Sequence, residues 1–187
     1  DLMKTPDSWM EVAVAGGIVP AKHLAAMGLF LMEMFAGCAS LTIDGPAVNN
    51  GIIISGTNSL TVSGAITMTA PTAGTVTSTI AVGTGTLSAA SIAIPGSATA
   101  GRFATVSVST GTINVTGDIT FSGTAAQARL TFTGAGTLNL GGNLSSGGTF
   151  AASTGKVNCN GSSAQTVAGY TYSTLKSNNT AGVTPLA

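Results

Sequence analysis

The side chains that could support catalysis are few and widely separated in this sequence of 187 residues. Beyond residue 40 there is no His and no Glu, and the only acids are Asp44 and Asp118. Glycoside hydrolysis by paired carboxylates needs two acids about 5 to 10 Å apart across the substrate. A Ser-His-Asp triad would depend on His23, the only histidine, which lies in a segment of different composition. The sequence therefore predicts no catalytic residue and no enzyme, and Asp118, in a Gly-Asp pair, is expected to be a turn residue.

Metal and cofactor motifs are equally scarce. Cys38 and Cys159 are far apart in the sequence, and neither belongs to a CxxC pair of the kind found in zinc and redox sites. No GxxxxGK[ST] phosphate loop occurs, so no cofactor and no metal are expected. The simplest interpretation of the cysteines is two buried thiols. Two alternatives stay open: a long-range disulfide formed in an oxidising compartment, and lipidation of Cys38, because FAGC at 35–38 resembles a degenerate bacterial lipoprotein box.

The composition excludes several classes of partner. Six Lys and Arg balance six Asp and Glu, so only 6% of the residues are charged, against about 25% in an average soluble protein. A chain with no net charge does not create the positive field that nucleic-acid binding needs. Since 44% of the residues are hydrophobic, the low charge indicates an ordered β structure with a Thr/Ser surface and not a disordered chain.

Residues 1–40 differ from residues 41–187 and are expected to form a separate, helical segment. Asp7-Ser8, with Glu11 three residues after Ser8, resembles the start of a capped helix, and a second helix is predicted from about 21 to 35. That helix is apolar on nearly all sides, so it must be buried. Its uninterrupted apolar run, 24–32, is shorter than the roughly 20 residues that cross a bilayer, so no transmembrane span is expected. Two interpretations remain: a cap or subunit contact, and a signal or lipoprotein-box remnant.

Residues 41–187 repeat a phrase in which apolar and small polar residues alternate, with Gly, Asn or Asp at the turns. Successive anchors lie 19, 27, 26, 25 and 19 residues apart. Near-constant spacings of this size indicate stacked repeats. The anchor positions are Leu41, Leu60, Leu87, Ile113, Leu138 and Val157.

This repeat predicts a mainly β fold, a parallel β-helix (β-solenoid) of about five coils with an N-terminal helical segment. One coil cannot bury its inward residues alone, whereas stacked coils bury a continuous column. Glycines at the corners are expected to supply positive φ angles, and a β-sandwich is the alternative fold. The helical segment could cover one end of the solenoid, and the C-terminal stretch has no evident cap. The expected inward columns are Ile80/Val106/Leu130, Val82/Val108/Phe132 and Leu87/Ile113/Leu138, and the corner glycines include Gly85, Gly111 and Gly136.

Two pairs of side chains bear on glycan binding. Arg102 and Arg129, 27 positions apart, are expected to align on one face of adjacent coils. They are interpreted as solvated charges at strand starts or as a contact for an anionic glycan. Tyr170 and Tyr172 are the only close pair of aromatics, whereas a glycan-binding module typically presents a row of them. A surface glycan is therefore kept as one candidate partner.

The repeated phrases resemble those of large secreted bacterial adhesin-like and autotransporter-like β-solenoid proteins. The resemblance rests on GTINVTGDITFSGTAAQARLTFTGAGTLNLGGNLSSGGTF at 111–150 and VNCNGSSAQTVAGYTYSTLKSNNTAGVT at 157–184, and covers about residues 41–187. It implies a non-enzymatic structural protein with an adhesin-like solenoid, placed outside the cell or at its surface. The alternative expectation is a self-associating filament subunit that uses the N-terminal helix for subunit contacts.

Overall fold

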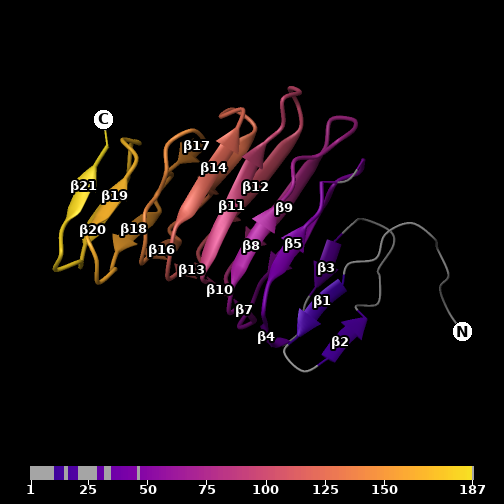
Figure 1. Cartoon of the computed structure of the whole chain (residues 1–187), viewed down its shortest axis with the longest axis horizontal. Helices are drawn as coiled ribbons and strands as arrows, with labels where there is room; N and C mark the ends of the chain where they lie inside the picture. Colours follow the sequence, from indigo (N-terminus) through magenta and orange to yellow (C-terminus); the bar gives the residue numbers. More distant parts are fainter. Residues whose placement is uncertain (1–10, 15–16, 21–28, 32–34, 46, 187) are drawn as a thin grey trace, which may run out of the picture.

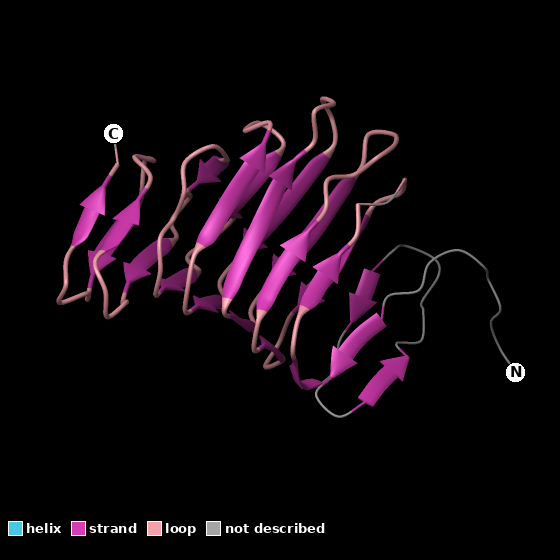
Figure 2. Ribbon diagram, in the orientation of Figure 1, coloured by secondary structure: helices cyan, strands magenta, loops and turns pink. Residues whose placement is uncertain are grey.

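The protein is a β-solenoid of about four turns, built from short parallel strands (Figures 1 and 2). The computed structural model describes residues 11–14, 17–20, 29–31, 35–45 and 47–186. All regular elements among these residues are strands. Three strands in succession, one in each of three sheets, make one coil of the solenoid, and the next coil stacks on it with its strands in register. The predicted β-helix is thus confirmed, and the β-sandwich alternative is wrong because the neighbouring strands of successive coils are parallel.

Sheet A contains nine strands in the order β2-β1-β4-β7-β10-β13-β16-β18-β20. The first two form an antiparallel pair, and from β4 onward the strands are parallel. The bounds are β1 (Glu11–Val14), β2 (Gly17–Pro20), β4 (Phe35–Cys38), β7 (Ser59–Val62), β10 (Thr86–Ala89), β13 (Thr112–Val115), β16 (Thr137–Leu140), β18 (Lys156–Cys159) and β20 (Thr174–Ser177).

Sheets B and C complete each coil. Sheet B has the order β17-β15-β12-β9-β6-β3, and sheet C has the order β14-β11-β8-β5. Two isolated bridges, from Ile119 to Leu144 and from Leu144 to Val167, connect sheet C to the strand pair β19–β21. The strands of sheet B are β3 (Leu29–Leu31), β6 (Asn50–Ile54), β9 (Thr77–Val82), β12 (Phe103–Val108), β15 (Ala128–Phe132) and β17 (Thr149–Ala151). Those on the side of sheet C are β5 (Leu41–Ile43), β8 (Ala65–Met68), β11 (Ser91–Gly96), β14 (Ile119–Gly123), β19 (Gln165–Val167) and β21 (Val183–Pro185).

The three predicted inward columns are confirmed by the strand register. In sheet A, Leu87 pairs with Ile113 and Ile113 with Leu138, and all three side chains are fully buried. The two columns of sheet B have the same regularity, because β12 pairs with both β9 and β15 at the expected residues. Alternation along each strand therefore places one set of side chains in a continuous aliphatic core and the other set on the outer face.

One anchor of the repeat is wrong. Leu41 pairs with Ile66 in sheet C, and the residue that pairs with Leu60 in sheet A is Phe35. The motif around Leu41 has the same alternation as the true anchors, and alternation alone does not distinguish one sheet of a solenoid from another. The remaining anchors, from Leu60 to Val157, pair in succession in sheet A. The solenoid has about four turns, against the expected five.

The predicted N-terminal helix is wrong wherever the structure describes its residues. Leu29–Leu31 and Phe35–Cys38 are strands, and they pair in parallel with β6 and β7. Segments 21–28 and 32–34 lie outside the described residues, as do Asp7, Ser8 and His23. The helical spacing of apolar residues misleads because the strands of a stacked solenoid are rich in apolar residues as well, so an apolar segment does not by itself distinguish a helix from a strand.

The corner glycines are required for a reason that differs from the predicted one. Gly85, Gly111 and Gly136 do not have positive φ angles. A Cβ atom added at Gly111 would lie 2.4 Å from the carbonyl oxygen of Gly85 in the preceding coil. The coils approach each other so closely at this corner that no side chain fits. Positive φ angles occur instead at other turns, for example at Gly74 (61°) and Gly101 (81°).

Candidate functional site

The outer face of sheet A carries a hydrogen-bonded row of polar side chains that runs along the solenoid. Asn114 donates from Nδ2 to Oγ of Ser88 (3.3 Å), and Asn139 donates to Oδ1 of Asn114 (2.8 Å). Asn158 donates to Asn139 (3.0 Å), and Asn178 donates to Asn158 (2.9 Å). We call these five residues the asparagine ladder. Each inner amide donates one hydrogen bond and accepts one, so the ladder links successive coils through half of the hydrogen-bonding capacity of these side chains.

Asp118 has the structural role that the sequence predicts. Its Oδ1 accepts hydrogen bonds from the backbone N–H (2.7 Å) and Nδ2 (3.2 Å) of Asn143 in the next coil. Asn143 Oδ1 in turn accepts from the backbone N–H of Thr166 (2.7 Å). Asp118 therefore lies at a turn and links the corner of its coil to the corner of the next, through a residue 25 positions away and not through the backbone of its own turn.

The two acids of the solenoid do not form a catalytic pair. Asp44 follows β5 and Asp118 precedes β14, and β8 and β11 lie between these strands in sheet C. Three strand spacings of about 4.8 Å separate the two strands by about 14 Å, beyond the range of paired-carboxylate hydrolysis. Among the described residues, no group of three or more His, Cys, Asp or Glu side chains could hold a metal ion.

The cysteines are two buried, free thiols. Cys38 lies on β4 and Cys159 on β18, and five strand spacings of sheet A, about 24 Å, separate these strands. That distance excludes the disulfide alternative in this fold, since bridged Cα atoms lie no more than about 7 Å apart. Burial raises the pKa of both thiols above the ordinary value. The Cys38 side chain is buried in the hydrophobic core cluster and packs among apolar side chains.

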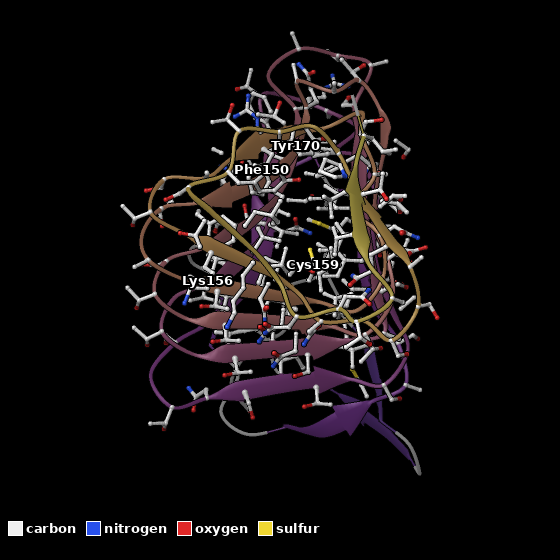
Figure 3. All side chains as sticks on the ribbon, turned by 90° about the vertical axis from the view of Figure 1, so that its left-hand side faces the viewer. Phe150, Lys156, Cys159 and Tyr170 are labelled. Carbon is white, nitrogen blue, oxygen red and sulfur yellow. The ribbon has the colours of Figure 1, made fainter. Side chains whose placement is uncertain are left out.

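Aromatic side chains gather where sheet B ends at β17, a grouping that the sequence analysis missed (Figure 3). Phe150 stacks on Tyr170, with ring centroids 5.3 Å apart and planes at 17°, and its centroid lies 5.1 Å from that of Tyr172. Phe132 packs against Phe150 from the coil before. The hydroxyl of Tyr172 donates to the backbone oxygen of Ala168 (2.7 Å). The rings of Phe150, Tyr170 and Tyr172 are partly buried and pack against the core beside the last strand of sheet B.

The two arginines of the described residues lie at a single corner of the solenoid, between sheets C and B. Arg102 ends the loop before β12, and its Nε donates to the backbone oxygen of Gly74 in the preceding loop (3.1 Å). Arg129 Nε donates to the backbone oxygen of Ala126 (2.9 Å). The Cζ atom of Arg129 lies 3.6 Å from the centroid of the Phe103 ring, a cation–π contact. We call Arg102, Phe103, Arg129 and the loops 69–76, 97–102 and 124–127 the arginine corner.

The predicted alignment of the two arginines is wrong in register. Arg129 pairs with Thr105, so it lies three residues further along its coil than Arg102 does. The sequence analysis also missed the contact between Arg129 and Phe103. The strands β12 and β15 pair with an offset of 24 residues, so Phe103 lies two residues before Thr105, the register partner of Arg129. The contact is therefore diagonal, and the repeat spacing alone does not reveal it.

Comparison of the chain with protein-family models, with curated proteins and with solved structures found no match. Within the described residues, no helix is long and apolar enough to cross a membrane. The interpretation of this solenoid therefore depends on its own residues.

Proposed function

We propose that this chain is a non-enzymatic structural protein with an adhesin-like solenoid, located outside the cell or at its surface. The observation that carries the proposal is the asparagine ladder together with the buried apolar core beneath it. The side chains of the three core columns are 0–3% exposed, and together with the hydrogen-bonded outer row they fix each coil to the next. Such a body serves as a rigid stalk, because each coil contacts only its neighbours and the length grows with every repeat.

The charge pattern and the placement of the acids support the same function. The outer positions of the sheets are mostly Thr, Ser and Asn, for example Thr112 and Asn114 on β13 and Thr137 and Asn139 on β16. An uncharged hydroxyl and amide surface binds few ions and is insensitive to the salt and pH changes met outside a cell. The separation of Asp44 from Asp118 argues against glycoside hydrolysis.

Localisation and adhesion can be tested together. Antibodies against the purified chain should label intact, unpermeabilised producing cells, and shaving these cells with protease should remove the label. Beads coated with the protein should bind to a glycan-bearing surface more than beads coated with a heat-unfolded sample. Label that appears only after permeabilisation would contradict the surface location, and turnover of a polysaccharide by the purified protein would contradict a non-enzymatic role.

A further inference from the structure

We infer that the arginine corner binds an acidic polysaccharide through the carboxylate or sulfate groups of its sugars. This inference deepens the proposed adhesin-like function by naming a surface and a class of partner. The first observation behind it is the length of the loops at this corner. In three successive coils the loops 44–49, 69–76 and 97–102 are longer than the loops at the other two corners. Each of these loops follows a strand of sheet C, and together they lie along one edge of the solenoid (Figure 1). Insertions in repeat proteins typically map to one face, which is often the binding face.

The second observation is the way the two guanidinium groups are held. Each donates through Nε to a backbone carbonyl, Arg102 to Gly74 and Arg129 to Ala126. The Phe103 ring supports the guanidinium plane of Arg129 at 3.6 Å. Both side chains are half-buried, so their stems are ordered while part of each group contacts solvent. A guanidinium fixed in this way loses little conformational entropy when its Nη groups bind an anion.

The chemistry of the corner selects the class of ligand. The planar fork of arginine matches the paired oxygens of a carboxylate or sulfate group. The acid on the same edge is Asp44, in the loop 44–49. The loop 69–76 lies between that loop and the loop 97–102, which carries Arg102. The exposed side chains of the loops at this corner are threonine hydroxyls and alanine methyl groups, for example Thr75, Thr99 and Ala125. Hydroxyl groups that donate and accept are suited to sugar hydroxyls, whereas nucleic acid would need a larger positive field than a chain of zero net charge provides.

The geometry also predicts a repetitive ligand. Arg129 contacts Phe103, which is the residue after Arg102, so the two cations belong to successive coils at one edge. A ligand with one isolated anionic group can engage one of them. A polymer with an anionic group on each sugar can engage both, and the second contact then forms at a high effective concentration.

The test uses the full chain, with binding measured on sensors that carry polygalacturonate, dextran sulfate or neutral dextran. The wild-type protein should bind at least one of the two acidic polymers and not neutral dextran, and the two acidic sensors distinguish carboxylate from sulfate recognition. Arg102→Gln and Arg129→Gln should each weaken binding roughly tenfold, as expected for a hydrogen bond between charged groups. Phe103→Leu keeps both charges and should produce a smaller loss, because it removes the support of Arg129.

A matched control separates this site from a general effect of charge. The double variant Lys156→Gln/Lys176→Gln removes two positive charges from strands β18 and β20 of sheet A and should bind as the wild type does. Thermal unfolding of every variant checks that the fold is retained. Equal losses in the arginine and lysine variants, or equal binding of the wild type to a polyphosphate, would overturn the inference. Absence of binding to both acidic polymers, together with surface labelling and bead adhesion as above, would refute the inference and leave the proposed function standing.

Discussion

The amide of Asn139 donates from Nδ2 to Oδ1 of Asn114 across 2.8 Å, and its own Oδ1 accepts from Asn158 in the following coil. Asn139 thus occupies the middle of the asparagine ladder. The side chain of Asn139 therefore connects three coils, although Asn114, Asn139 and Asn158 are far apart in the sequence.

Replacing this residue should uncouple the ladder. Asn139→Ala leaves Asn114 Oδ1 and Asn158 Nδ2 without their partners in half-buried positions, so we expect the free energy of unfolding to fall by about 1–3 kcal/mol. Thr137→Ala is the matched control, because Thr137 lies on the same strand and the same outer face. It should cost less than about 1 kcal/mol. Urea unfolding measures both values, and equal losses would show that the ladder contributes nothing beyond strand propensity.

The close approach of the coils predicts a severe effect of one methyl group. In Gly111→Ala the new Cβ would lie 2.4 Å from the Gly85 oxygen and 3.0 Å from Cγ1 of Val82. Since the first neighbour is backbone, the coils must separate locally, and we expect a loss of about 3 kcal/mol.

A second glycine provides the contrast. Gly56 has a φ of 64° and no atom within 4 Å of an added Cβ. Gly56→Ala should therefore cost only the conformational strain of a left-handed residue, about 1 kcal/mol. If chemical denaturation ranks Gly56→Ala as the more damaging change, backbone conformation and not coil contact is what requires glycine at these corners.

The buried thiols predict slow chemistry in the folded state. We expect a thiol reagent to leave Cys38 and Cys159 unmodified in the native protein at neutral pH, because burial removes access and raises both pKa values. Unfolding in denaturant without a reductant should expose two reactive thiols. Detection of none after unfolding, with an intact mass two hydrogens lower, would establish a disulfide and require another arrangement of sheet A.

Tyr172 predicts a loss of stability in alkali. Burial, with smaller contributions from Cys159 and Tyr170, raises its pKa to about 12, against about 10 in an unfolded chain. Below pH 10 both states keep the proton, so the group has no effect there. Above pH 10 the unfolded chain releases the proton and the folded chain retains it, so the free energy of unfolding should fall until about pH 12.

Phenolate absorbance can follow this group by itself. Tyr170→Phe leaves Tyr172 as the one tyrosine of the sequence, and the variant should titrate well above pH 10 when folded and near pH 10 in denaturant. Identical titration curves in the two conditions would mean that the ring of Tyr172 is not buried against Phe150.

Much of the solenoid follows from the sequence because its contacts are nearly local in the repeat. Residues one period apart are spatial neighbours, so the alignment of Leu87, Ile113 and Leu138 already predicted a column that the register confirms. The Gly-Asp pair separately predicted that Asp118 lies at a turn. The error at Leu41 shows the limit of the method, because all three sheets share a period of two and the repeat alone does not assign a strand to one of them.

What the sequence by itself determined is therefore the architecture: a charge-poor, alternating chain whose apolar phrases recur at near-constant spacing buries its apolar residues by stacking coils. The tertiary structure decided which side chains meet across the coils. It placed Arg129 over Phe103, joined four asparagines and a serine into one row, gathered Phe150 with Tyr170 and Tyr172, and replaced an expected helix by strands. The physical reason is that loop length sets the register of one coil on the next, and a shift of one residue reverses which side chains face outward.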